Sequence, residues 1–308
     1  MITILLAAYN GERYLEEQIE SILQQTCTDW ELIIQDDCSS DDTAVIALKY
    51  VKQSPDKVRF VRREFQSGSA KNNFFSMLKL SKNDYVMTCD QDDVWLPNKV
   101  EVTLKEMHGL EAEHGYKRPL LVHTDLKVVD CNLRVIEESM FKRQNLNSRR
   151  DKLNYLLVQN IVTGCTTMVN RALLDMVHEA PTGAMMHDWW LALIACAFGK
   201  IGFVDQSTVL YRQHGRNQVG AKDASSLWYN LKRLSETNLS KQVLQDTYLQ
   251  AQAFSTTYGE MLLPQLLEFT REYSSIPVCE KIKRLQTIYK YHFWKSGFVR
   301  KCGQVLFV

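Results

Sequence analysis

Three aspartates stand within four positions of the stretch TCDQDDVW, directly after an apolar run at 84–89 that we expect to be a buried strand. Asp90, Asp92 and Asp93 would repel one another unless a cation or a hydrogen-bonding ligand neutralises them. Hard divalent cations such as Mg²⁺ or Mn²⁺ are held by one or two carboxylates together with the phosphates of a substrate. The cluster therefore suits a metal-bound nucleotide diphosphate. The alternative is a solvated acidic turn that caps the next helix, and this stretch alone leaves both interpretations open.

Two other polar stretches stand later in the chain. In MMHDWWLAL, Asp188 precedes an apolar helix pattern, where an aspartate is usually a helix cap. In YRQHGRN, His214 follows a strand pattern, where a lone histidine is more often a surface or packing residue than a ligand. Taken by themselves, these residues do not specify a reaction.

The first 110 residues alternate between strand and helix patterns. Apolar runs predict strands at 2–8, 30–36, 58–62 and 84–89, and apolar residues at helical spacing predict helices at 12–25, 44–51, 68–80 and from 97 onward. Strict alternation implies a parallel sheet with helices on both faces. Ligands bind such sheets at the carboxyl ends of the strands, near a switch in strand order. The polar stretches AAYNGE, QDDCSSDD and CDQDD follow the first, second and fourth strands, so we expect them at one binding edge.

The pattern changes from Pro119. We predict antiparallel strands at 120–130 and 134–140, a strand at 162–170, two short strands at 201–205 and 207–214, and helices at 151–159 and 188–198. Beyond Gly220 only helical patterns remain, at 227–234, 239–269 and 279–293. We therefore predict a boundary near residue 220, between a mixed α/β domain at 1–220 and a helical C-terminal region at 221–308.

Composition limits the class of protein. The net charge of +1 over 308 residues gives no global electrostatic reason to expect a nucleic-acid partner. The eight cysteines are scattered singly without a CxxC pair, which favours reduced thiols in a cytosolic protein over disulfides or a zinc site. Met1 leads straight into an apolar strand pattern without a basic region, so no signal peptide is expected. The apolar run at 191–198 is too short to span a bilayer. We expect a cytoplasmic protein that is soluble or lies on a membrane surface.

The motifs AAYN, IIQDDCSSDDT and YVMTCDQDD, in this order, resemble those of family 2 glycosyltransferases of the GT-A fold. The resemblance extends over roughly residues 1–218. It implies an α/β fold with a Rossmann-like, mostly parallel central sheet and helices on both faces, here with a helical C-terminal extension. It also implies a nucleotide-binding half at 1–118 and an acceptor-binding half at 119–220.

The resemblance assigns nucleotide contacts to the loops after the first two strands. It implies that Ala8 and Tyr9 lie along the nucleotide base and that Asp37 accepts a hydrogen bond from the base imide N–H. We prefer Asp37 to the adjacent Asp36, which would point the other way at a strand end. Lys71 stands where the family often has an arginine, and is either a point charge near the diphosphate or an exposed lysine at a helix start.

The acidic motif would hold the ribose and the metal-bound diphosphate. We assign Asp92 and Asp93 to Mg²⁺ or Mn²⁺ ahead of Asp90, which would instead hold the ribose or shape the turn. The resembled enzymes frequently place a histidine where His214 stands, to complete the metal site or to contact the diphosphate. Positive charge for the phosphates would come from two arginines in the same stretch, Arg212 and Arg216.

The resemblance places the reacting carboxylate on the acceptor side. Asp188 matches the general base of the family, which removes the proton of the acceptor hydroxyl as the sugar C1 is attacked from the face opposite the nucleotide. His187 is the competing base. Gly164, in VTGCTTMVNR, would let the backbone approach the donor sugar. Trp189 and Trp190 are either core residues or a ring face for a sugar.

The stretches AAYNGERYLEEQIESI, DQDDVWLP, HDWWLAL and YRQHGRNQVGA look most like those of bacterial rhamnosyltransferases. The resemblance implies an inverting, metal-dependent hexosyltransferase that moves L-rhamnose from dTDP-rhamnose to a lipid-linked saccharide in cell-wall or capsular polysaccharide synthesis. A UDP-sugar donor with the same fold and mechanism is the nearest alternative. A phosphotransferase of the haloacid dehalogenase type is more distant, because its aspartate would follow the first strand. A non-catalytic glycan-binding protein is the other distant alternative.

The C-terminal segment 281–308 carries seven Lys or Arg residues and no Asp or Glu, interleaved with aromatic residues. It could contact the inner face of the bacterial cell membrane, with aromatics at headgroup level. The alternative is a core-packing helix with a solvated basic face. The helical pattern at 239–269 could also form a homo-oligomer interface.

Overall fold

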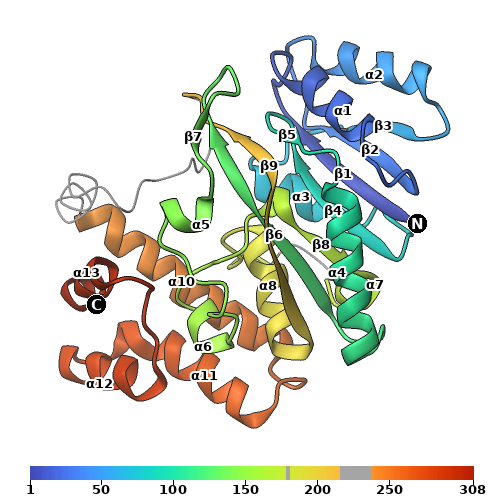
Figure 1. Ribbon diagram of the computed structural model, residues 1–308. Coiled ribbons are helices and arrows are strands. Elements are labelled where there is room, and N and C mark those ends of the chain that lie inside the picture. The colour runs from blue at the N-terminus through green and yellow to red at the C-terminus, as the bar shows by residue number, and fades with distance from the viewer. Residues whose placement is uncertain (178–180, 216–236) are drawn as a thin grey trace. The chain divides into compact units, whose positions relative to one another are not determined.

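The computed structural model describes residues 1–177, 181–215 and 237–308, which form two compact units (Figure 1). The first unit comprises 1–140, 162–180 and 199–220, and the second comprises 141–161, 181–198 and 221–308. The segments 141–161 and 181–198, which the sequence places in the 1–220 domain, thus pack with the C-terminal helices. The helix expected at 227–234 lies outside the described residues.

The first unit contains one nine-stranded sheet among its described residues, in the order β3-β2-β1-β4-β8-β6-β9-β5, with β7 paired to β6. Its strands are β1 Ile2–Ala8, β2 Trp30–Asp36, β3 Val58–Arg62, β4 Tyr85–Asp90, β5 Val94–Trp95, β6 Leu120–Val129, β7 Val135–Glu137, β8 Met168–Asn170 and β9 Lys200–Arg212. Neighbours among β1 to β4 are parallel, as are β6 and β9, whereas β8 is antiparallel to both β4 and β6.

The strand order brings the expected edge together. β1 has β2 on one side and β4 on the other, so the order reverses beside β1. The register pairs Ala8 with Asp36 and Ala7 with Asp90, which places three carboxyl strand ends side by side. This is the crevice in which parallel α/β sheets bind ligands, and it confirms the mostly parallel α/β fold predicted from the sequence.

Amphipathic helices cover the sheet of the first unit. The longer ones are α1 Leu15–Leu23, α2 Thr43–Gln53, α3 Ala70–Leu78 and α4 Lys99–His114. α3 packs on β1, and α4 packs on β6 and β9. Apolar residues at helical spacing make these contacts, and Ile19, Ala47 and Met107 are fully buried.

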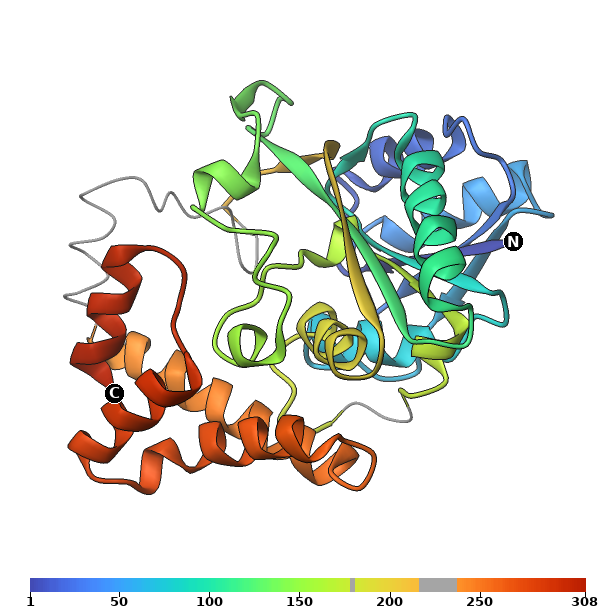
Figure 2. The ribbon, with the colours of Figure 1, turned by 60° about the horizontal axis from the view of Figure 1, so that its bottom comes forward.

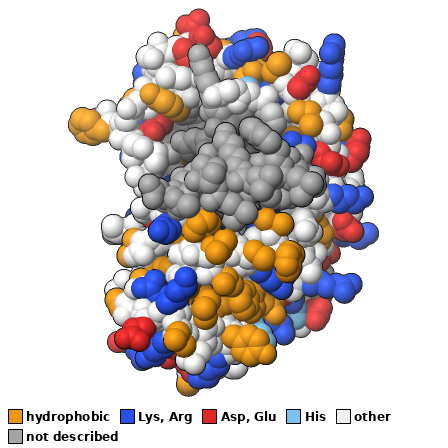
Figure 3. Space-filling view, turned by 90° about the vertical axis from the view of Figure 1, so that its left-hand side faces the viewer, with side chains coloured by type: hydrophobic (Ala, Val, Ile, Leu, Met, Phe, Trp, Pro, Cys, Tyr) orange, Lys and Arg blue, Asp and Glu red, His pale blue; other side chains and the backbone are white. Residues whose placement is uncertain are grey.

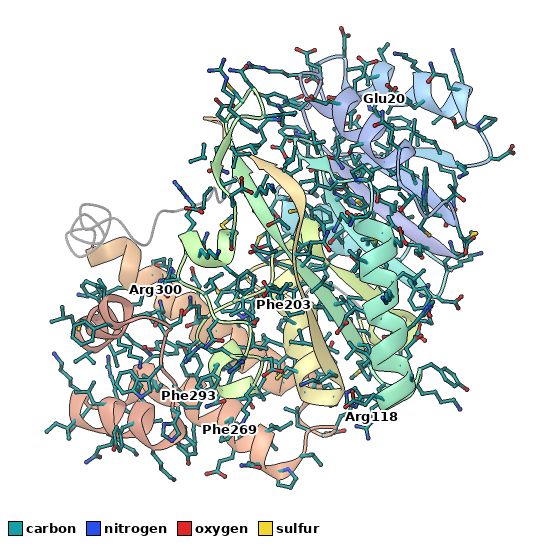
Figure 4. The ribbon with its side chains drawn as sticks, viewed as in Figure 1. Glu20, Arg118, Phe203, Phe269, Phe293 and Arg300 are labelled. Carbon is teal, nitrogen blue, oxygen red and sulfur yellow. The ribbon has the colours of Figure 1, made fainter. Side chains whose placement is uncertain are left out.

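The second unit is helical. Its helices include α6 Leu153–Leu156, α8 His187–Phe198, α10 Thr237–Tyr258, α11 Pro264–Ser275, α12 Lys281–Tyr291 and α13 Phe298–Phe307. α11 runs back along α10 (Figure 2). Aromatic rings fill the space between the helices, and Phe269 meets Phe293 edge to face at 6.3 Å (Figure 4). None of the described helices is both long enough and apolar enough to cross a membrane.

The structure differs from the sequence expectations mainly beyond Pro119. The helix expected at 151–159 is only the short α6. Of the strand expected at 162–170, only the last three residues form a strand, β8, and Gly164–Thr166 form a 3₁₀ turn. The two strands expected at 201–205 and 207–214 are one strand, β9, whose pairing with β6 shifts register. The single helix expected at 239–269 is two helices, because Pro264, which lacks an N–H, starts α11.

Candidate functional site

Side chains of the second loop hold the backbone of the first at the binding edge. The Asn10 N–H donates to Ser39 Oγ at 2.9 Å, and the Gly11 N–H donates to Thr43 Oγ1 at 2.8 Å. Asn10 has a φ of 48°, and its side-chain Oδ1 accepts from the Ser40 N–H at 2.9 Å. The turn after β1 is therefore fixed before any ligand arrives.

Gln91 clamps the same turn from the acidic motif. The Tyr9 N–H donates to Gln91 Oε1 at 2.8 Å, and Gln91 Nε2 donates to the Tyr9 carbonyl at 3.0 Å. Ala8 is buried, whereas Tyr9 is half exposed. A Cβ on Gly11 would lie 2.2 Å from Gln91 Oε1, so the Gln91 amide could keep its present position only beside a glycine. The sequence does not single out Gln91, because a glutamine between aspartates carries no spacing signal.

The three aspartates divide into an outer and an inner part. Asp92 lies partly exposed, and its Oδ2 is 2.8 Å from His214 Nε2. Asp93 is fully buried and accepts from the Arg212 N–H at 3.1 Å. Burial, reinforced by the nearby Asp92 and Asp90, raises the pKa of Asp93 well above its usual range. Asp92 and His214 come from segments 122 residues apart and meet at the edge.

Arg212 holds the acidic motif in place. Its Nε donates to the Asp92 carbonyl at 2.9 Å, one terminal nitrogen donates to the Cys131 carbonyl at 2.9 Å, and the other pairs with Glu17. The guanidinium lies 4.5 Å above the Tyr14 ring, which also lies 5.1 Å from the His214 ring. Because Arg212 is 2% exposed, it positions the motif, in contrast to the expected phosphate contact. Arg216 lies outside the described residues.

A buried cluster backs the acidic motif. Asp90, Asp93 and Cys165 offer ligand atoms within 4.8 Å of one another. Burial raises the pKa of Cys165 well above its usual range, so the thiol keeps its proton and is a poor ligand for a hard cation. Lys99 is fully buried 4.6 Å from the Trp95 ring, and burial lowers its pKa to about 8. The partly exposed donor groups at this edge are the Asp90 and Asp92 carboxylates and the His214 imidazole, oxygen and nitrogen ligands that Mn²⁺ accepts.

Asp37 lies at the end of β2 with both carboxylate oxygens engaged. The Ser67 N–H and Oγ donate to them at 2.7 and 2.6 Å, and Arg63 Nε lies 3.2 Å away. Asp36 is fully buried and accepts from the Ser39 N–H at 3.0 Å. Asp37 is therefore the slightly more accessible of the two.

Two further predicted ligand contacts lie in the first unit, Lys71 at its surface and Gly164 in its interior. Lys71 is partly exposed in the first turn of α3. Gly164 is buried, and its carbonyl accepts from Thr88 Oγ1 of β4 at 2.6 Å. The turn that carries Gly164 is thereby fastened to the strand that ends in the acidic motif.

The second unit carries the stretch HDWW at the start of α8. Asp188 is 8% exposed, and its Oδ1 accepts from the Trp189 N–H at 2.7 Å. Trp189 Nε1 donates to the Leu156 carbonyl at 2.6 Å. His187 is 2% exposed, and burial lowers its pKa to about 3. An enclosed imidazole with a lowered pKa is a weak base, so His187 competes poorly with Asp188 for the proton.

Of the two interpretations of Trp190, a core residue or a ring face for a sugar, the structure favours the core residue. Its side chain has no exposed surface and packs against Phe254 at 5.4 Å and Tyr258 at 6.0 Å. A sugar ring can stack on an indole only where at least one face of the indole is accessible. Trp190 is therefore a core residue of the second unit.

A comparison with models of known protein families finds a match to the first part of the chain. Residues 3–117 match the model described as Glycosyl transferase family 2. These residues form a family 2 glycosyltransferase domain. The match includes the loops after β1 and β2 and the whole acidic motif, whereas His214, Gly164 and Asp188 lie beyond its end.

Relatives and a solved structure extend the likeness beyond the glycosyltransferase domain. The dTDP-rhamnosyl transferase RfbG of Shigella flexneri is 26% identical over an alignment of 283 residues, which covers 84% of this chain and 91% of that protein. The Escherichia coli UDP-Glc:alpha-D-GlcNAc-diphosphoundecaprenol beta-1,3-glucosyltransferase WfgD is 26% identical over 176 residues, 57% of this chain and 62% of that one.

The mannosyltransferase PcManGT of Pyrobaculum calidifontis, solved with GDP-Man and Mn²⁺, has a TM-score of 0.55 at 15% identity, covering 99% of this chain and 83% of that chain. This likeness supports the predicted GT-A fold. Together with the family domain, the relatives support a transferase, as predicted.

Replacing Gly11 by alanine is expected to weaken nucleotide binding by the glycosyltransferase domain by up to about thirtyfold. The new Cβ would displace the Gln91 amide and break the two hydrogen bonds to Tyr9, each worth about 1 kcal/mol. Calorimetric titration with dTDP and Mn²⁺ measures the effect. Gly109→Ala, in α4 with open space around its Cα, is the matched control and should bind as wild type does. Equal affinities of both variants would contradict the clamp.

Replacing Arg212 by methionine is expected to lower the free energy of unfolding by about 2–3 kcal/mol, because the buried carbonyls of Asp92 and Cys131 lose their donor. Denaturant titration measures this. Arg13→Met is the control, since Arg13 is exposed and lies 5.0 Å from the ring of Tyr14 on which Arg212 also stacks. Its effect should stay within about 0.5 kcal/mol. Similar losses in the two variants would show that stacking, and not the carbonyl contacts, is what matters.

Proposed function

We propose that this protein is an inverting glycosyltransferase that moves a sugar from a nucleoside diphosphate donor with the help of Mg²⁺ or Mn²⁺. The observation that carries the proposal is the meeting of Asp92 and His214 at 2.8 Å beside the carboxyl end of β4, within the unit that contains the family 2 domain. A carboxylate and an imidazole, both partly exposed, form a ligand pair next to the loops that the family uses for the nucleotide.

The metal would be held on the outer side of the acidic motif. Asp92 and His214 supply an oxygen and a nitrogen ligand, and the bound cation would neutralise the charge that develops on the departing nucleoside diphosphate. Asp90, at the strand end, would hold the ribose. Asp93 was predicted as a second ligand, but its complete burial favours a role in fixing the turn through the Arg212 N–H.

The nucleotide base would lie on the turn after β1. The exposed ring of Tyr9 and the backbone of Ala8 offer a surface for it, and the clamp from Gln91 keeps this turn from moving when the nucleotide binds. Ser67 donates one hydrogen bond to each Asp37 oxygen. Each oxygen keeps a second lone pair, and one of these would accept a hydrogen bond from the base imide N–H. Lys71 would add a positive charge near the diphosphate.

Asp188 would act as the general base. Its carboxylate would take the proton of the acceptor hydroxyl while that oxygen attacks C1 of the donor sugar and the bond from C1 to the diphosphate breaks. One attack from the opposite face inverts the anomeric configuration. The N-terminal turn of α8 fixes the Asp188 carboxylate through the Trp189 N–H. Gly164 and Trp189 remain proposed sugar contacts, and the buried His187 supports the assignment of the base to Asp188.

L-Rhamnose from dTDP-rhamnose is the proposed donor sugar, with a lipid-linked saccharide of a bacterial polysaccharide pathway as acceptor. Support comes from RfbG, a dTDP-rhamnosyl transferase by name, which matches this chain over most of both lengths. The name of WfgD states a UDP-Glc donor and a diphosphoundecaprenol-linked acceptor, so a UDP-sugar is the second candidate for the donor. The names of these relatives favour sugar transfer over the phosphotransferase and the non-catalytic alternatives.

A donor screen tests the assignment. The unfolding midpoint of the protein would be measured with dTDP-rhamnose, UDP-glucose, UDP-GlcNAc and GDP-mannose, each with Mn²⁺ and with EDTA. A ligand that binds only the folded state raises the midpoint. We expect the largest rise with dTDP-rhamnose and Mn²⁺. A rise with UDP-glucose and none with dTDP-rhamnose would overturn the donor, and no rise with any nucleotide sugar would overturn the function.

A further inference from the structure

Helix α13 exposes large apolar side chains to solvent and buries a polar one. In α13, Phe298 is 81% and Leu306 is 61% exposed, whereas the polar Gln304 on the opposite side is 2% exposed. Gln304 Nε2 donates to the Phe293 carbonyl at 2.7 Å, and its Oε1 accepts from the Lys295 N–H at 3.0 Å. A surface helix ordinarily buries its apolar side and exposes its polar side. α13 does the reverse.

The exposed side of α13 forms one continuous apolar face. We define the α13 face as Trp294, Phe298, Cys302, Val305 and Leu306, which line an open groove of about 550 Å³ together with Lys301. Phe298, Cys302 and Leu306 are spaced by four residues and so lie above one another on the helix. In Figure 3, hydrophobic side chains gather on the lower half of the molecule among Lys and Arg side chains. Contiguous apolar surface of this kind marks an interaction site.

Positive charge surrounds the α13 face. The chain contains no Asp or Glu from 281 to 308, and Lys295, Arg300 and Lys301 stand within and beside the face. On α12, Ile282 and Tyr289 are each 73% exposed next to Lys283 and Lys290. The charge of Lys290 is partly balanced by Glu268 and Glu272 of α11.

The chemistry of this surface fits an anionic lipid bilayer. Apolar side chains enter the boundary between headgroups and acyl chains, tyrosine and tryptophan lie at headgroup level, and lysines meet the lipid phosphates. A second copy of the chain fits less well, since a two-fold symmetric contact would bring the same cationic surfaces together. We propose that the α13 face, with the exposed residues of α12, docks this protein onto the surface of an anionic membrane.

Vesicle flotation tests the docking and needs neither donor nor metal. The full chain would be mixed with vesicles of phosphatidylcholine alone and with vesicles that also contain phosphatidylglycerol. We expect binding to the anionic vesicles that weakens with salt and is at least about tenfold weaker on neutral ones. Equal binding to both kinds of vesicle, or binding to neither, would overturn the proposal. The result is independent of the proposed sugar transfer, so the two can fail separately.

Two substitutions locate the contact. Phe298→Ser and Leu306→Ser should each lower the vesicle partition coefficient by about tenfold or more, because each removes a large apolar side chain from the face. Leu263→Ser is the matched control, since Leu263 is 68% exposed at the start of α11 and serine is a favourable residue there. Circular dichroism verifies the fold of each variant. An equal loss of vesicle binding by Leu263→Ser would show that the contact lies elsewhere. If wild type formed dimers but bound no vesicles, and Leu306→Ser abolished the dimers, the α13 face would be a protein interface instead.

Discussion

Sugar transfer by an Asp92→Asn variant is expected to fall by about three orders of magnitude. Removing the carboxylate removes one ligand of the proposed metal, and metal stabilisation of a departing diphosphate is worth several kcal/mol. His214, 2.8 Å from Asp92, would keep its place, so the fold should be unchanged. Release of nucleoside diphosphate from the donor, followed over a range of Mn²⁺ concentrations, gives kcat and the metal dependence together.

Asp84→Asn is the matched control for this prediction. Asp84 precedes β4, whereas Asp92 follows its carboxyl end, and the Asp84 side chain is 77% exposed. Its variant should turn over as wild type does, because it removes a charge of the same kind away from the binding edge. If Asp92→Asn kept wild-type turnover and the same Mn²⁺ dependence, the metal assignment would be wrong.

Asp188→Asn is expected to lower kcat by about 10²–10⁴-fold while the affinity for dTDP stays at the wild-type value. Asparagine has nearly the same shape and can still accept the Trp189 N–H through its carbonyl oxygen, so the start of α8 should remain intact. It cannot take a proton from the acceptor hydroxyl. Steady-state kinetics with saturating donor, combined with calorimetric titration of dTDP, separates the two effects.

Asp246→Asn serves as the control within the same unit. Asp246 lies on α10 and accepts only from the exposed Gln242 amide at 2.8 Å among the bonds described. Its variant should keep wild-type kcat. Full turnover by Asp188→Asn would remove the base assignment, and a loss of dTDP affinity in that variant would point to a structural role for the carboxylate.

The first half of the fold follows closely from the sequence, because its strands are uninterrupted apolar runs and its helices keep an apolar spacing. The edge at Ala8, Asp36 and Asp90 could be placed from the alternation of strands and helices, because that alternation implies parallel strands, whose carboxyl ends lie at one edge of the sheet. Beyond Pro119 some strands pair antiparallel and others parallel, and the pairing of β6 with β9 shifts register. No single spacing of apolar residues therefore predicts these strands.

The division of labour among the aspartates could not be read from their spacing. Asp92 and Asp93 are adjacent, yet one faces the edge and the other the interior, and the difference depends on Arg212, more than a hundred residues later. The core position of Trp190 could not be read from its neighbours in sequence either. Trp190 is enclosed by rings of α10, a helix whose position no local pattern in HDWW reveals.

The pairing of Asp92 with His214 is tested most directly by nucleotide binding with and without metal. The unfolding midpoint would be followed against dTDP concentration, with Mn²⁺ or EDTA, for wild type, Asp92→Asn, His214→Gln and Asp84→Asn. We predict a rise that requires Mn²⁺ in wild type and Asp84→Asn and is lost in the other two variants. An equal rise in EDTA, or an undiminished rise in both Asp92→Asn and His214→Gln, would contradict the proposed metal-diphosphate site.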